Sequence, residues 1–230
     1  MEKSVRPCGQ RRWAHGLWVV AASGAGFAVS ALGSGFWQLA RHWFLVPYVV
    51  VVGAFLLTYV RWSGMDMGAH LCQRWKAGLL GAIMLSLVMV CSVLRQPASS
   101  YPQGWALLFA LVWLGLIYGT LDGMFLTVMP VLAVQQILGV RVGGDDGASP
   151  YVRMLASLGA SLLVTTAYHW GFAEFRGAQV VSPLIGNALI TSGYLVTGSP
   201  IPPVVAHIAM HIAAVLHGME TTVQLPPHSH

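Results

Sequence analysis

Two histidines near the C-terminus have a spacing that suits metal binding. His207 and His211 lie four residues apart in an apolar segment. On an α-helix this spacing puts both imidazoles on one face, where they can share one ion. His217 lies ten residues beyond His207, about 80° away around the helix, so we assign it to the helix end and not to this pair.

Two further polar residues could complete a metal site. His169 ends another apolar segment, and Asp122 is the one of seven acidic residues that lies inside such a stretch. A carboxylate at bilayer depth costs about 2.5–3.5 kcal/mol on insertion scales and normally faces a polar partner. Three imidazoles and this carboxylate would make a tetrahedral shell for a divalent metal, with zinc as the candidate. The alternatives are a protonated Asp122 that hydrogen-bonds to a neighbouring helix and, for the buried polar candidate Asn187, a packing role.

The elements that must position these residues are membrane helices. Of 230 residues, 56% are hydrophobic and only 8% are charged, whereas a soluble domain has about 25% charged residues. This composition excludes an ordinary soluble domain and a disordered chain, and without a basic stripe it gives no sign of a nucleic-acid partner. We therefore predict an all-α polytopic membrane helix bundle.

Seven apolar runs are long enough, at about 20 residues, to cross a membrane. They are 16–40, 44–62, 76–94, 104–138, 152–172, 180–199 and 200–219. The fourth is too long for one perpendicular crossing, so it must tilt, project or break near Gly119, Gly123 or Pro130. Seven helices are predicted, or eight if this run breaks. Cys91, inside the third run, is expected to be a small core residue.

The placement of basic residues orients this bundle. With the N-terminus in the cytoplasm, the inside segments hold nine Lys and Arg residues and the outside segments hold three, as the positive-inside rule requires. We expect a multi-pass protein of the bacterial inner membrane with a cytoplasmic N-terminus. The layout is a basic segment at 1–15 that includes Cys8 as a free thiol, one transmembrane domain at 16–219, and a polar tail at 220–230. Residues 139–150 are expected to form a flexible inside connection.

Three motifs in the C-terminal half follow the order known from one family. Residues 121–126, Leu-Asp-Gly-Met-Phe-Leu, stand where that family has Glu-Glu-x-x-x-Arg, often with Phe before the Arg. Residues 165–169, Thr-Thr-Ala-Tyr-His, stand where it has Phe-x-x-x-His. Residues 198–211 contain a Gly-Ser-Pro turn followed by His-x-x-x-His, where it has a similar turn and polar pair. Over about residues 104–217 the chain thus resembles the CPBP (CAAX protease and bacteriocin-processing, or Abi) intramembrane proteins.

The resemblance implies an intramembrane metal-dependent endopeptidase that cleaves membrane-associated peptides or prenylated proteins. His169, His207 and His211 would then hold the metal, and Asp122 would be the general base. Membrane lipid and a membrane-bound peptide substrate are the expected partners. Because the first motif keeps one carboxylate and lacks the Arg, the alternative is a catalytically inactive scaffold or an accessory subunit of a larger membrane protein complex.

Overall fold

The computed structural model describes residues 12–72, 74–139 and 148–225, and these contain helices and no β-strand. Several expectations lie outside the described residues: Cys8 and most of the basic N-terminal segment, most of the 139–150 connection, and the end of the polar tail.

The helices follow one another along the chain with short connections. They are α2 (Ala14–Ser30), which continues as a π-helical segment (Ala31–Phe36), α3 (Arg41–Ser63), α4 (Met67–Cys72), α5 (Trp75–Leu94), α6 (Gly104–Ala110), α7 (Tyr118–Asp122), α8 (Met129–Ile137), α9 (Pro150–Trp170), α10 (Val181–Thr197) and α11 (Ile201–His217).

Five helical stretches in the described residues are long and apolar enough to cross a membrane. They are Ala14–Phe36, Arg41–Ser63, Trp75–Leu94, Gly104–Ile137 and Ala178–Thr197. Helix α11 is apolar but has only 17 residues, and α9 has 21 residues but is not among the five. An all-α bundle of membrane helices is therefore confirmed, whereas crossings by α9 and α11 stay a prediction.

The long fourth segment does not break. Gly104–Ile137 is one helix of 34 residues and, at 1.5 Å per residue, spans about 50 Å. Between α6, α7 and α8 it winds as a π-helix, over Leu111–Ile117 and over Gly123–Val128. These two segments lie on either side of Asp122. Because π-helical turns are rare and concentrate at functional sites, they draw attention to this residue.

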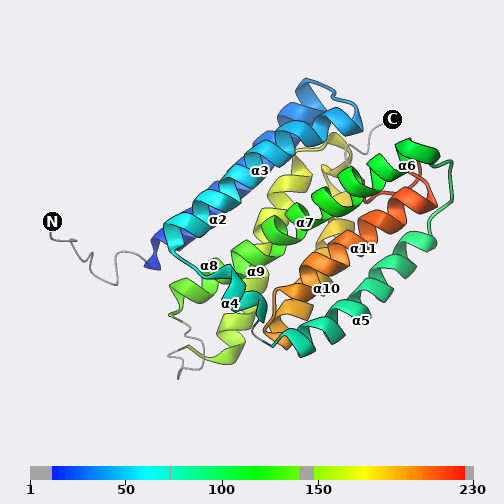
Figure 1. The fold of residues 1–230 in the computed structure, drawn as a ribbon. Helices are drawn as coiled ribbons and strands as arrows, with labels where there is room; N and C mark the ends of the chain where they lie inside the picture. Colours follow the sequence, from blue (N-terminus) through cyan, green and yellow to red (C-terminus); the bar gives the residue numbers. More distant parts are fainter. Residues whose placement is uncertain (1–11, 73, 140–147, 226–230) are drawn as a thin grey trace.

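The long helix and α11 run through the middle of the bundle (Figure 1). The hairpin of α2 and α3 lies along one edge and α5 along the other, with α11 packed between α5 and α7. Apolar side chains cover the outside: Val50 is 64% exposed, Leu80 65% and Val196 80%. Such a surface suits lipid and would not suit water.

The expectation that Cys91 is a core residue is wrong, because its side chain is exposed. It lies on α5, which packs one face against α11 and α10 and leaves the rest of its surface open. A helix that is apolar all round gives no pattern in the sequence to indicate which side turns inward.

Candidate metal centre

Three glycines on the long helix allow α11 to approach it closely. Gly115, Gly119 and Gly123 are spaced by four residues and so share one face of the helix. A Cβ atom at Gly119 would lie 2.8 Å from the Cα of Ile208, and one at Gly123 would lie 2.8 Å from the Cα of Val204. Only glycine fits where two backbones come this close. The expectation from the sequence treats Gly119 and Gly123 only as possible break points, although small residues at this spacing are a known signal for packing of membrane helices.

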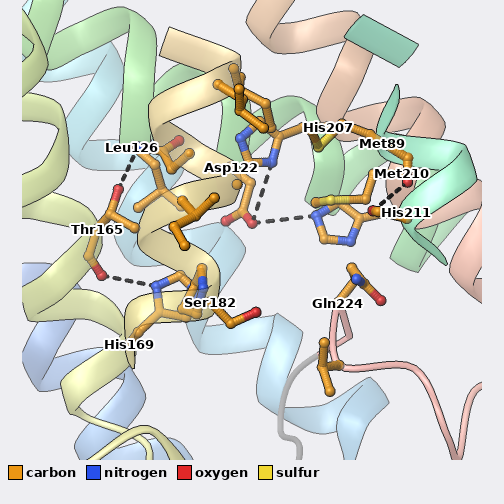
Figure 2. A pocket seen from close by; sticks show the side chains of 18 of the residues that line it. Met89, Asp122, Leu126, Thr165, His169, Ser182, His207, Met210, His211 and Gln224 are labelled. Carbon is orange, nitrogen blue, oxygen red and sulfur yellow. Dashed lines mark hydrogen bonds and ion pairs between the residues drawn. The ribbon is translucent and has the colours of Figure 1, made fainter. Parts of the chain in front are cut away.

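This close packing puts the two histidines of α11 beside Asp122 of α7. The Asp122 Oδ2 atom is 3.4 Å from His211 Nε2 and 3.9 Å from His207 Nδ1 (Figure 2). Ligand atoms of the three residues all lie within 4.8 Å of one another. Around a tetrahedral ion with bonds of about 2.0–2.1 Å, neighbouring ligand atoms are about 3.3 Å apart. The contact between Asp122 and His211 is close to this value and the other separations are wider, so the three side chains could hold an ion if they drew slightly closer.

The group is buried, and the ring nitrogens of its histidines make no hydrogen bond within the described part of the chain. Asp122 and His207 are each 4% exposed and His211 is 1% exposed. All four ring nitrogens of the two histidines are buried without a hydrogen bond to any described residue. Since an unpaired buried polar group costs about 1–3 kcal/mol, native proteins rarely leave several together. A bound cation would supply the missing partner for a nitrogen of each ring.

Tyrosines from three helices surround the group. Tyr48 of α3 donates a hydrogen bond of 2.5 Å to Asp122 Oδ1. The ring of Tyr118 packs on that of His211 with centroids 4.6 Å apart, and its hydroxyl is 2.9 Å from the hydroxyl of Tyr168. Sequence analysis missed all three. Tyr118 could have been found, because it lies one helical turn before Asp122, but Tyr48 is 74 residues away in the chain.

The group forms part of the wall of a cavity of about 460 Å³. Residues of α5, α7, α9, α10 and α11 line it together with the segment after α11. Among the described lining residues, Asp122 is the only acidic one. The cavity has the size of a small-molecule site and gives the centre room for a substrate.

The remaining histidine of the sequence prediction, His169, lines the same cavity but contributes no atom to the group of ligands. Its Nδ1 atom is 2.8 Å from the backbone oxygen of Thr165. Figure 2 shows dashed lines from Asp122 to His207 and to His211, whereas the line from His169 leads to Thr165. The structure thus brings together three of the four predicted site residues and places the fourth at the same cavity.

The two other polar residues that sequence analysis considered have structural partners. Asn187 is buried and hydrogen-bonds to Thr127, Ser161 and Thr165, which agrees with a packing role. His217 is the last residue of α11, and its Nε2 atom is 2.7 Å from the backbone oxygen of Gln96. It lies at the helix end, as predicted.

The fold and the site define a multi-pass helical membrane protein with a buried Asp-His-His group that could hold a metal ion. Comparisons of the chain with protein-family models, with curated proteins and with solved structures give no match. The relation to the CPBP family therefore rests on the order of the motifs and stays a prediction.

Proposed function

We propose that this chain is a metal-dependent hydrolase that cleaves peptides within the membrane. The observation that carries the proposal is the set of buried ring nitrogens on His207 and His211 that make no hydrogen bond among the described residues and face a carboxylate at the wall of a cavity. A purely structural cluster would have used these nitrogens in hydrogen bonds between helices.

In this proposal Asp122, His207 and His211 are the metal ligands. Two imidazoles and one carboxylate are the ligand set of several catalytic zinc sites, which keep a fourth position open. Zinc is therefore the metal we propose. The ion would supply Lewis acidity, which activates water and polarises a carbonyl group. The protein's part is to hold the three buried ligands at the wall of the cavity.

His169 is the residue we propose for proton transfer. A backbone oxygen can only accept a hydrogen bond, so Nδ1 of a neutral His169 ring carries the proton in its contact with Thr165. The other nitrogen, Nε2, then keeps its lone pair and can accept a proton. Because the ring lines the cavity, a water molecule there can reach it. This proposal exchanges the roles that the motifs suggested, with Asp122 as a ligand and His169 as the base.

A membrane-associated peptide is the substrate that the cavity favours. Its lining includes apolar residues of three helices, among them Val88, Leu126 and Leu189, and polar groups such as Asn187. Val88 and Leu189 are also 49% and 46% exposed. A chain with apolar side chains and polar peptide groups matches such a surface.

The protein as a whole is proposed to cross the bacterial inner membrane seven times, with α9 and α11 as the fifth and seventh crossings along the chain and the N-terminus in the cytoplasm. The distribution of basic residues supports this orientation.

A non-catalytic scaffold or accessory subunit is the second candidate. The observation that favours it is the lack of any other carboxylate among the described residues that line the cavity. If Asp122 is a ligand, a hydrolase must rely on an imidazole as its base. In a scaffold the same three residues would join α7 to α11.

Metal content and peptide cleavage, measured on the purified protein, test the proposal. We expect about one zinc ion per wild-type chain and a loss of more than 100-fold in zinc affinity in His211→Ala. A side chain bound directly to the metal matters more than the groups that hydrogen-bond to the ligands, whose loss costs about 10–100-fold. His217→Ala is the matched control, since that histidine lies on the same helix but bonds to Gln96. His169→Ala should keep zinc and lose about 10²–10⁴ in cleavage of quenched-fluorescence transmembrane peptides.

Equal zinc affinity in His211→Ala and wild type would refute the metal centre. A wild type that binds zinc but cleaves none of a broad set of such peptides would favour the scaffold. If His169→Ala still cleaves these peptides, His169 is not the base and another group must accept the proton.

A further inference from the structure

We infer that Tyr48 is a positioning residue that makes Asp122 a ligand through one oxygen only. The inference rests on the proposed metal centre and extends it to α3, outside the segment 104–217 that carries the motifs. Its basis is that the two carboxylate oxygens of Asp122 have different partners. Oδ1 accepts the 2.5 Å hydrogen bond from Tyr48, whereas Oδ2 faces His207 and His211.

The hydrogen bond from Tyr48 is of the strong kind. O–H···O⁻ bonds of about 2.5–2.7 Å are charge-assisted and about twice as strong as bonds between neutral groups. Tyr48 is fully buried and Asp122 nearly so, so no bulk water competes for Oδ1. A phenol in this place occupies one of the two lone pairs of Oδ1 and draws its electron density, which disfavours a second bond from Oδ1 to a metal ion.

The position of the Tyr48 ring is itself fixed by its neighbours. Its centroid lies 5.1 Å from that of Tyr118 and 5.6 Å from that of Tyr168. The hydroxyls of Tyr118 and Tyr168 bond to each other, and Asp122 is the hydrogen-bond partner of Tyr48 among the described residues. The phenol is therefore held on Oδ1, and its loss would free the carboxylate to turn.

The consequence concerns the coordination number of the metal. A carboxylate that binds through one oxygen leaves a three-ligand site four-coordinate with one open position, whereas binding through both oxygens raises the number to five. Tyr48 would thus keep the open position available. Partners in the outer shell of other metal sites orient ligands in this way, and their removal costs about 10–100-fold in affinity.

Titration with Co²⁺ in detergent tests the inference, because four-coordinate Co²⁺ absorbs visible light more strongly than five-coordinate Co²⁺. We expect Tyr48→Phe to bind Co²⁺ about 10–100-fold more weakly than wild type and to show weaker absorption at saturation. Tyr59→Phe is the matched control. Tyr59 is 1% exposed on the same helix, and its hydroxyl is 3.0 Å from His15 Nδ1, away from the metal centre.

The outcomes separate this inference from the proposed function. If Tyr48→Phe matches wild type in affinity and spectrum, Tyr48 does not position Asp122, although the metal centre stands. If wild type binds no Co²⁺, the metal centre fails and the inference fails with it. If Tyr48→Phe does not fold, the infrared difference between the zinc-loaded and metal-free wild type decides. A wide separation of the two carboxylate stretching bands supports binding through one oxygen, and a narrow one refutes it.

Discussion

Two polar clusters lie inside this bundle, and they differ in how far their polar atoms are hydrogen-bonded. In the cluster around Asn187, the side-chain amide group donates to Ser161 and Thr165, and the side-chain oxygen accepts from Thr127, at 2.7–2.9 Å. The hydroxyl of Ser161 also contacts that of Thr191 at 2.9 Å. These bonds join α9 and α10 to the long helix, and each polar side chain has a partner of its own.

The cluster around Asp122 is buried to the same degree but leaves the ring nitrogens of His207 and His211 without hydrogen bonds. The difference shows that burial alone does not distinguish a candidate ligand site from a polar cluster that only holds helices together. What distinguishes them is whether the polar atoms find partners within the chain. The two clusters meet at Thr165, whose hydroxyl bonds to Asn187 and whose backbone oxygen bonds to His169.

The largest effect should come from filling the contact between α7 and α11. Gly119→Leu would drive a side chain into the backbone of α11 at Ile208, 2.8 Å from where its Cβ must lie. We expect a loss of about 3 kcal/mol or more in the free energy of unfolding, at the upper end for overpacking, together with loss of zinc, since the histidines would move away from Asp122. Denaturant unfolding in detergent and zinc content measure the two effects.

Gly159→Leu is the control for that substitution, because a Cβ at Gly159 meets nothing within 4 Å and this glycine also lies inside a long helix, α9. A Gly119→Leu protein with wild-type stability and zinc would show that the close contact does not form.

A smaller effect is expected from Asn187→Ala, which removes three hydrogen bonds from the cluster around Asn187. At about 0.6 kcal/mol for each bond between membrane helices, we expect a loss of about 2 kcal/mol in the free energy of unfolding. Zinc affinity should stay within about threefold of wild type, since Asn187 is not among the ligands. Unfolding curves and zinc titration of the same preparation measure both quantities.

That pair of measurements separates the clusters. His211→Ala should lose zinc, whereas Asn187→Ala should lose stability and keep zinc. If Asn187→Ala folds like wild type but loses zinc, the two clusters are not independent and the expectation is wrong.

The sequence predicted the helices well because their signal is local. The long apolar run 104–138 corresponds to the helix Gly104–Ile137, and the cost of a carboxylate in lipid identified Asp122 as unusual. The four-residue spacing also placed His207 and His211 on one face. What the sequence could not supply is the rotation of each helix about its axis. Apolar residues surround most of these helices, so no amphipathic stripe indicated that Cys91 faces outward.

Contacts between distant helices were equally hidden. Nothing near Tyr48 in the chain indicates that its hydroxyl meets Asp122, because the pairing depends on how α3 packs against the long helix. For the same reason the sequence could not show that His169, on α9, lies at the cavity without joining the ligand group.

The smallest effect should come from Thr165→Val, at the junction of the two clusters. This change of similar shape removes two hydrogen bonds of the Thr165 hydroxyl, one accepted from Asn187 and one donated to the backbone oxygen of Ser161 in its own helix. It keeps the backbone oxygen that holds His169. Beyond the loss shared with a control that removes only a bond within the helix, we expect a loss of about 0.6 kcal/mol in the free energy of unfolding, with zinc affinity and peptide cleavage unchanged. Thr166→Val is the matched control, because the hydroxyl of Thr166 bonds only within its own helix, to Leu162. If Thr165→Val lowers cleavage while Thr166→Val does not, the hydroxyl of Thr165 acts on the site through more than its hydrogen bond to Asn187, and the two clusters are then one functional unit.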